Sequence, residues 1–405
     1  MSISLKLNIG DSVVIVSRGT ESYIVKMQSG FFGILVNEGG STPGISSILT
    51  APIVDYGGSW LTIPIPIPTS GYGQFQTPSN SVKSNGSAII NVQTSSSSLS
   101  LILSLQNDPS TFSNQRTGLF TTNIRTSNNS SYSIAGILEL QAGQPLFIYL
   151  YLTSPGSYSI QPGSRVCVAA VQQEYESFNV VLPSSVYQTK SNDWVVIETW
   201  SESQKSDSFV FTEKLVSGKY TAMATGIYYL SANVIFKDSN GPIYIMIAVN
   251  NQLSKRTALY ATKGKPSVVQ NSLSVSGALF IKKDSYVNVY VMIENDNSWS
   301  IDIDSTFSMV FLGYQTNIFG VTTVLTNTLA YTTSGWFEIG KWKSQIAAGP
   351  FFDFGGGFNP DTGDFVAPKA GFYIVSAGIK MVQASVVGCT FTLNVAVNGT
   401  PSTLQ

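Results

Sequence analysis

Histidine is absent from all 405 residues of this chain. Its absence removes the commonest general base, the usual zinc ligand and the side chain that changes charge near neutral pH. A Ser-His-Asp or Cys-His mechanism therefore has no base within the chain. No motif singles out a pair of carboxylates for glycoside hydrolysis either. We therefore expect a protein that is not an enzyme and that needs no cofactor.

Charge, cysteine and long apolar runs are scarce as well. Charged residues make up 11% of the chain, against roughly 25% in average soluble domains, and the formal net charge is -1. Because such a chain has no long-range field that attracts phosphates or anionic lipids, we expect no nucleic acid partner and no membrane insertion. A net charge near zero instead favours self-association. The two cysteines, Cys167 and Cys389, are too few for a disulfide framework.

Apolar residues alternate with polar ones along most of the chain. Period two, or a short β-branched run, occurs in segments such as Ser12–Val16, Leu99–Leu103, Ile243–Val249 and Val287–Ile293. Glycine, asparagine, aspartate and proline separate these runs at close intervals. No segment combines the helical period with helix caps. The sequence therefore predicts an all-β fold, either a sandwich or a barrel.

One strand motif occurs three times. The chain reads GIYYLSANVIF from Gly226 and GFYIVSAGIKM from Gly371, and a weaker copy, GSAIINV, starts at Gly86. A second strand that ends in asparagine follows each copy. These copies form the opening half of a repeated unit.

The closing half of the unit recurs in the same way. A strand, a tight turn and a second strand are followed each time by a closing strand that begins with serine. The three strand-turn-strand segments begin at Ser276, Ala135 and Ser4, and the closing strands begin at Ser305, Ser164 and Ser29. Three closing halves therefore accompany three opening halves.

The order of these halves predicts a split unit. Residues 1–37 hold only the closing half of a unit, and residues 319–405 hold only an opening half. Between them lie a first complete but divergent unit at 38–183 and a second complete unit at 184–318. The average of about 135 residues per unit is an ordinary domain size.

The segment from Phe358 to Ala377 resembles the signature of the C1q/TNF superfamily. It contains Thr-Gly-x-Phe, a proline and Gly-x-Tyr leading into a strand, and the triplet from Gly226 to Tyr228 repeats its end. The family's last strand and its Gly-Asp hairpin are similar to segments of this chain at Ser305, Ser29, Gly10-Asp11 and Lys283-Asp284. The resemblance covers essentially the whole chain and is weakest in the first complete unit.

The resemblance implies ten-stranded jelly rolls that pack into trimers through flat apolar faces. We therefore expect three C1q/TNF-like jelly-roll sandwiches in one chain, with the third completed by strands from the opposite terminus or from a neighbouring chain. Three units in one chain would form a pseudo-trimer without a partner. The fold alone does not fix a function.

Half a jelly roll exposes unpaired strand edges and a wet inner face. Three interpretations of the split unit stay open: closure within one chain, closure between chains into a homo-oligomer or filament, or a piece cut from a longer repeat array. The strands at both ends that would carry this assembly contain Ser4, Leu5, Leu7, Val13, Val14, Ile15, Phe31, Phe32, Ile34, Phe391, Leu393, Val395 and Val397.

Acidic residues flank a predicted hairpin around Trp299. Carboxylate oxygens are the ligands that calcium prefers, and some C1q-like trimers bind calcium near their axis. The candidate ligands are Glu294, Asp296, Asp302 and Asp304. A solvated turn is the alternative interpretation, and we favour it because the spacing matches no defined calcium loop.

Four asparagines head Asn-x-Ser/Thr sequons, which are glycosylation acceptors in secreted proteins. They are Asn85, Asn128, Asn129 and Asn398. In a chain so rich in asparagine and serine, several such sequons arise by chance. They therefore give only weak support to an extracellular setting.

The leading hypothesis is a structural, self-assembling, extracellular protein: a filament, matrix, coat or biomineral scaffold subunit whose hydroxyl-rich surface faces a glycan or a mineral. If the protein is secreted, its signal has been removed or lies outside this sequence. The second hypothesis is a soluble lectin or pattern-recognition module of C1q type. The third is a viral capsid or fibre protein, because capsids also use jelly rolls.

Overall fold

The computed structural model confirms the all-β class, since every helix or strand assigned in its described residues is a strand. Within these residues no helix has the length and apolar character of a membrane span. The described residues are 2–7, 9–19, 23–25, 30–38, 44–48, 53–56, 60–62, 66–67, 71–72, 75–76, 82–94, 98–104, 118–124, 129–140, 145–152, 157–160, 165–171, 177–189, 192–202, 215–237, 241–253, 258–263, 270–296, 299–303, 305–314, 320–325, 329–331, 335–338, 342–343, 352–354, 357–359, 361–369, 371–378, 381–383, 391–397 and 400–401.

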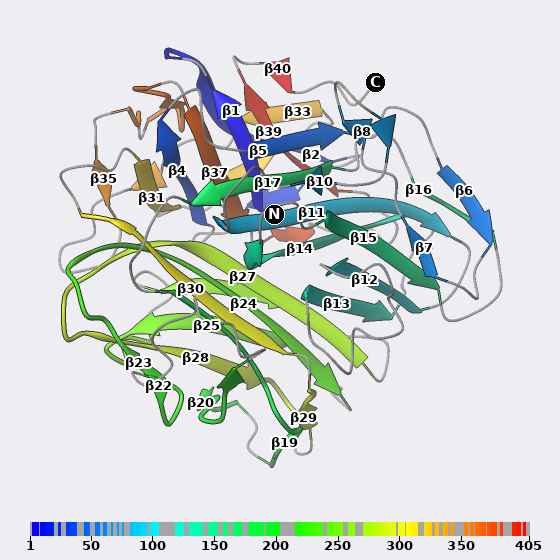
Figure 1. Cartoon of the computed structure of the whole chain (residues 1–405), viewed down its shortest axis with the longest axis vertical. Coiled ribbons are helices and arrows are strands. Elements are labelled where there is room, and N and C mark those ends of the chain that lie inside the picture. The colour runs from blue at the N-terminus through cyan, green and yellow to red at the C-terminus, as the bar shows by residue number, and fades with distance from the viewer. Residues whose placement is uncertain are drawn as a thin grey trace.

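Three regions of the chain each form an inner and an outer sheet, and Figure 1 shows them grouped around a common centre. In the middle region the longest strands, β24 and β27, pair along their whole length. Its inner sheet contains β19 (Val186–Gln188), β29 (Trp299–Ile301), β24 (Gly226–Lys237), β30 (Thr306–Gly313), β18 (Ser177–Val181), β21 (Ser201–Glu202) and β27 (Gln270–Ile281). Its outer sheet contains β22 (Leu215–Val216), β23 (Lys219–Thr221), β28 (Tyr286–Ile293), β25 (Ile243–Val249), β26 (Leu259–Lys263) and β20 (Val195–Val196).

The early region has the same kind of arrangement around β11, which pairs with three other strands. Its inner sheet contains β5 (Gly44–Ile48), β17 (Arg165–Val171), β11 (Val82–Thr94), β16 (Ser157–Ile160), β6 (Ile53–Tyr56) and β14 (Asn129–Leu140). Its outer sheet contains β10 (Phe75–Gln76), β15 (Pro145–Leu152), β12 (Ser98–Ser104), β13 (Gly118–Ile124) and β7 (Trp60–Thr62), and β8 (Pro66–Ile67) pairs with β9 (Gly71–Tyr72).

The split region draws its strands from both ends of the chain. Its inner sheet contains β1 (Ser2–Leu7), β37 (Gly371–Gly378), β4 (Gly30–Glu38), β31 (Gly320–Leu325), β34 (Trp342–Lys343) and β35 (Asp353–Phe354). Its outer sheet contains β33 (Gly335–Glu338), β2 (Ser12–Gly19), β39 (Phe391–Val397), β40 (Thr400–Pro401) and β36 (Phe365–Val366). A third, small sheet contains β32 (Leu329–Tyr331), β3 (Tyr23–Val25) and β38 (Met381–Gln383).

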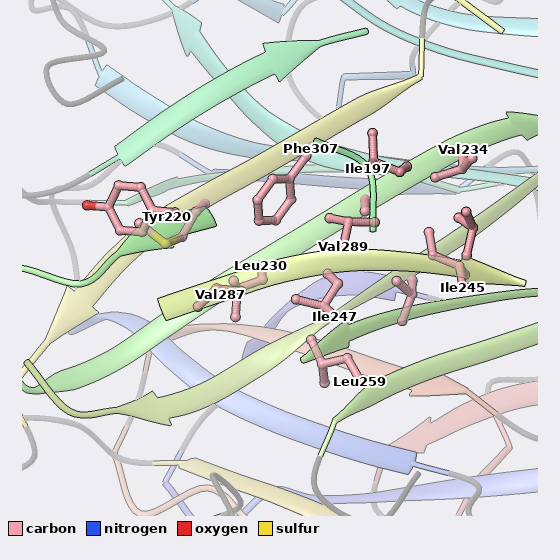
Figure 2. Close-up of a cluster of buried hydrophobic side chains, with 14 of the residues drawn as sticks. Ile197, Tyr220, Leu230, Val234, Ile245, Ile247, Leu259, Val287, Val289 and Phe307 are labelled. Atoms are coloured by element: carbon pink, nitrogen blue, oxygen red, sulfur yellow. The ribbon is translucent and has the colours of Figure 1, made fainter. Parts of the chain in front are cut away.

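The core of the middle region lies between its two sheets. Alternate residues of β24, such as Leu230 and Val234, point into it, and alternate residues of β25 and β28, such as Ile245 and Val289, meet them (Figure 2). The period-two pattern of the sequence thus places its apolar side chains on the face of each strand that packs in the core. Complete burial of each such side chain contributes roughly 1.5–3 kcal/mol. The core therefore fixes the register of the strands that border the other regions.

Strand β18 belongs to the middle region. Ser177 to Val181 pair with β30, and Val181 also pairs with Ser201. The expected division between residues 183 and 184 therefore cuts through this sheet. Strand β18 pairs with β30 in the way that β5 pairs with β17 and β31 pairs with β4.

The middle and split regions share several local details. Strand β24 has a bulge against β30 between Ile227 and Tyr228, and β37 has one against β4 between Phe372 and Tyr373. The hydroxyl of Tyr228 donates to the carbonyl of Ala224 at 2.8 Å, and the hydroxyl of Tyr373 donates to the carbonyl of Lys369, also at 2.8 Å. Both tyrosines are fully buried. The Gly-x-Tyr motif thus marks one repeated backbone shape.

The tight turns after β1 and β27 also match. The Gly10 amide donates to the Ala367 carbonyl at 2.9 Å, and the Ala367 amide donates to the Asp11 carbonyl at 2.8 Å. In the middle region Asp284 and Ser285 make the same two bonds with Ala222, each 2.8 Å long. Gly10 and Asp284 both have positive φ, +87° and +66°. Gly10 in the split region therefore corresponds to Asp284 in the middle region.

Candidate assembly interface

The four strands within residues 2–38 pair with strands from the other end of the chain. Strand β4 pairs with β37 on one side and with β31 on the other, while β2 lies between β39 and β33 and β3 lies between β38 and β32. Strand β1 covers the free side of β37. Figure 1 shows the blue strands β1 and β4 beside the brown strand β37.

All thirteen predicted assembly residues lie on these strands. Leu5 is opposite Tyr373, Ile15 is opposite Val395, and Ile34 is opposite both Ile374 and Gly320. Strand β2 pairs with Phe391, Leu393, Val395 and Val397, and β39 pairs with Val13 and Val14. Strand β37 pairs with Ser4 and Leu7. Between β31 and β37 lie Phe31 and Phe32. The predicted residues therefore face each other across one boundary between residues 2–38 and residues 320–401.

A second boundary joins the middle and split regions. Ile227, Tyr229 and Ala278 project from the middle inner sheet and pack with Phe352 and Ile374 of the split region; Val310 and Leu312 complete this cluster. The hydroxyl of Thr322 donates to the carbonyl of Ala278 at 2.6 Å. All of these residues are buried. The two inner sheets thus meet through an apolar face, and the Thr322 hydroxyl adds a hydrogen bond across it.

The early region contacts both of the others. Its strand β14 contacts β24, β27 and β30 of the middle region, and β1 of the split region contacts β11, β14 and β17. Strand β27 in turn contacts β4, β31 and β37. Each inner sheet therefore touches the other two, and this explains why these sheets lie at the centre of the molecule.

Part of the middle inner sheet is buried although it is polar. The Ser308 hydroxyl donates to Asn179 Oδ1 at 2.9 Å, and the Ser274 hydroxyl donates to Asn233 Oδ1 at 2.7 Å. Ser308, Asn179 and Asn233 are buried. Burial of such groups is tolerated because they satisfy each other. The low charge of the chain therefore reflects, in part, hydroxyl and amide groups used for packing.

Asp353 is an exception among these contacts. Its Oδ1 atom is buried and has no hydrogen-bond partner, and burial raises the pKa of the carboxyl above its ordinary value. It lies between Phe352 and Phe354, whose rings stack with centroids 5.0 Å apart. Phe354 also meets Phe280 of the middle region edge to face at 6.0 Å. A titratable residue therefore lies next in sequence to two residues of the second boundary.

The calcium candidates do not gather around one point in the described residues. Asp302 Oδ2 forms a 2.6 Å ion pair with Lys237 Nζ, and its Oδ1 accepts a hydrogen bond from Ser185 at 3.1 Å. Asp296 is buried, Glu294 is half-buried, and Asp304 lies outside the described residues. No group of three or more Asp, Glu or Cys side chains in the described part of the chain is arranged to hold a metal.

The sequons fall in different surroundings. Asn85 lies inside β11, opposite Ile137 on one side and Ala169 on the other. Asn129 is the first residue of β14 and is opposite Gln93. Asn128 and Asn398 lie outside the described residues. Glycosylation acceptors are typical of surface loops, so Asn85, in the middle of a sheet, is an untypical acceptor.

Sequence reasoning missed the residues of the second boundary. Thr322 lies in β31, Ala278 lies in β27, and Phe352 directly precedes β35, so the three residues share no motif. No local pattern marked them, because the face of β24 that carries Ile227 and Tyr229 continues with the polar residues Ser231 and Asn233.

Comparison with known proteins gives a fold-level likeness. No protein-family model and no curated protein sequence matches the chain. Among solved structures, Eiger, a TNF of S. frugiperda, is 15% identical, with 35% of this chain and 95% of that one covered and a TM-score of 0.28. Murine APRIL is 14% identical, with 33% and 97% covered and a TM-score of 0.26.

The globular domain of zebrafish complement 1qA protein also matches. It is 14% identical, with 35% of this chain and 99% of that chain covered and a TM-score of 0.24. The sheets of this chain are thus similar in structure to C1q/TNF jelly-roll domains over about a third of its length.

Proposed function

We propose that this chain is a structural, self-assembling building block made of three C1q-like jelly-roll units, the third of which is split between the two ends of the chain. The observation that supports this most directly is the threading of residues 2–38 between strands of residues 320–401. Three inner sheets that touch one another would then form a pseudo-trimer from one polypeptide. Such a core needs no partner.

The chemistry of the chain supports a structural role over catalysis. The chain has no histidine, and its formal net charge is -1. Low repulsion between copies favours association. The proposed setting is extracellular, as a filament, matrix, coat or biomineral scaffold subunit, and its partners are further copies of the chain with a glycan or a mineral surface.

One observation favours a second function, a soluble lectin or pattern-recognition module. One chain contains partners for all the described strands of the split region, and their pairing within the chain would close one molecule of 43.5 kDa. A closed particle built from three units would suit recognition of repeated ligands. In that case the protein would bind as a discrete particle and would not form large assemblies.

Light scattering of the purified protein over a range of concentrations, followed by negative-stain electron microscopy, tests the proposal. Fibres, sheets or large particles that grow with concentration without any ligand would support the structural role. A single species of 43.5 kDa at every concentration would contradict it and favour the recognition module. Glycan-array binding by that species would then be the next measurement.

A further inference from the structure

The split region consists of two parts of the chain, the strands within residues 2–38 and the strands β31–β40. Residues 2–38 enter it as four strands, and three of these, β2, β3 and β4, have strands of the other terminus on both sides. No peptide bond within the described split region links these four strands to β31–β40. The pairing between the two parts is therefore noncovalent along its whole length.

The same pairing can form in two ways. The strands within residues 2–38 pair with β37, β39, β38 and β31 without a covalent link, and a second copy of the chain presents identical strands. Exchange of an identical element keeps every contact and changes only which chain supplies it. Its equilibrium therefore depends on protein concentration and on the connection between the two parts.

We propose that residues 2–38 are an exchangeable segment that completes the split region of a second copy of this chain. The proposal deepens the self-assembling function proposed above and rests on it. If each chain gives its segment to the next, the contact is head to tail and builds a ring or a filament. If two chains exchange mutually, it builds a closed dimer.

The chain length limits how far the partner can be. Strand β4 ends at Glu38 and β5 begins at Gly44, so residues 39–43 alone connect the segment to the early region. A fully extended connection of this length spans about 20 Å. The acceptor copy must therefore pack against the early region of the donor, next to the inner sheet that β1 and β4 already contact.

Disulfide trapping can show which chain supplies the segment. Ser2 and Ser376 are partners across β1 and β37, so Ser2→Cys with Ser376→Cys places one thiol on each part. The background carries Cys167→Ser and Cys389→Ser. The matched control is Ser276→Cys with Ser231→Cys, which are partners across β27 and β24. The two regions share the same turn and the same tyrosine hydrogen bond. The pair Ser276 and Ser231 in the middle region therefore corresponds to the pair Ser2 and Ser376 in the split region.

Each variant is unfolded in denaturant, refolded at low and at high protein concentration, oxidised, and run on a nonreducing gel. We expect the Ser2/Ser376 variant to form disulfide-linked dimers and higher ladders, whose fraction rises roughly tenfold over a hundredfold rise in concentration. The control variant should form its disulfide within one chain at every concentration. Refolding a mixture of ¹⁵N-labelled and unlabelled chains should give cross-linked peptides of mixed label.

The outcomes separate the two proposals. Large species whose disulfides all lie within single chains would overturn segment exchange and leave self-assembly through outer surfaces. An absence of large species, with all disulfides within chains, would overturn both. If the first variant fails to fold, Arg18→Cys with Thr392→Cys, partners across β2 and β39, repeats the test at a second place.

Discussion

The middle and split regions reach the same strand pairing by different chain connections. In the middle region β24, β27 and β30 follow one another within residues 226–313, whereas in the split region β37 lies between β1 and β4 from the opposite end of the chain. The bulge, the tyrosine bond and the turn after the first hairpin strand are nevertheless the same. Side-chain pattern and backbone pairing therefore specify this arrangement more strongly than loop connectivity does.

The comparison also teaches where the molecule is weakest. The cost of closing a loop rises only slowly with its length, so a long separation between paired strands is not itself destabilising. The split region, however, consists of two parts that can separate without breaking a covalent bond. The middle region instead has one core formed by a continuous stretch of the chain. We expect the two regions to respond unequally to truncation and equally to local substitutions.

Removing residues 1–38 should have the largest effect. Strand β37 would lose both of its neighbours, and β2 would leave β39 and β33 unpaired on one side. Limited proteolysis with mass spectrometry should then show cleavage throughout residues 320–401, while residues 177–313 stay protected as an internal control. Protection of residues 320–401 in the truncated chain would contradict the dependence of the split region on this segment.

Phe307→Ala in the middle core should come next. Phe307 is fully buried, with its ring 5.0 Å from Phe178 and 5.9 Å from Trp200. Truncating a buried phenylalanine typically costs about 3–5 kcal/mol of unfolding free energy. Tyr187→Ala, at a side chain that is 79% exposed, should stay within about 0.5 kcal/mol. Urea unfolding followed by tryptophan fluorescence measures both, and equal costs would argue against this core.

Tyr228→Phe and Tyr373→Phe test whether the tyrosine hydrogen bond contributes equally to the unfolding free energy in the middle and split regions. Each change removes one hydroxyl that donates to a backbone carbonyl four residues earlier. Loss of such a bond costs about 1 kcal/mol. We expect the two variants to lower the unfolding free energy by similar amounts in urea titrations. A cost in one region only would show that the shared geometry does not carry a shared energy.

Gly10 and Asp284 should respond in opposite directions. Both occupy the same turn with positive φ, which favours glycine over residues with a Cβ atom. Gly10→Ala should destabilise by about 1 kcal/mol, even though a Cβ there would meet no atom within 4 Å. Asp284→Gly should be neutral or stabilising by a few tenths of a kcal/mol. Differential scanning calorimetry of both variants checks the signs, and destabilisation by Asp284→Gly would contradict the argument.

The fold class and several strands were predictable because they depend on short, local sequence patterns. Period two gave the all-β class, and the Gly-x-Tyr copies located β24 and β37. The boundary between the middle and split regions was not predictable, because Phe352 and Ile227 meet only when the inner sheets of the two regions pack together. The ion pair of the calcium candidate Asp302 with Lys237 was not predictable either, because the two residues are distant in sequence.

The smallest effect should come from Asp353, next to that boundary. Burial raises the pKa of its carboxyl in the folded chain above the ordinary value that it has when unfolded. The charged form is therefore penalised at neutral pH, and this penalty disappears as the pH falls through the folded-state pKa towards the ordinary one. The contribution of Asp353 should thus make the unfolding free energy rise slightly on acidification across that window.

Asp353→Asn keeps the shape of the side chain and removes the charge. We expect this variant to be slightly more stable than the unaltered chain at pH 7 and to lose that advantage at acidic pH, as measured by thermal unfolding across the range. Asp361→Asn is the matched control, because Asp361 is an exposed turn residue whose amide donates to Asn359 Oδ1 at 3.0 Å. If both variants shift stability alike at every pH, the effect does not come from burial beside the boundary.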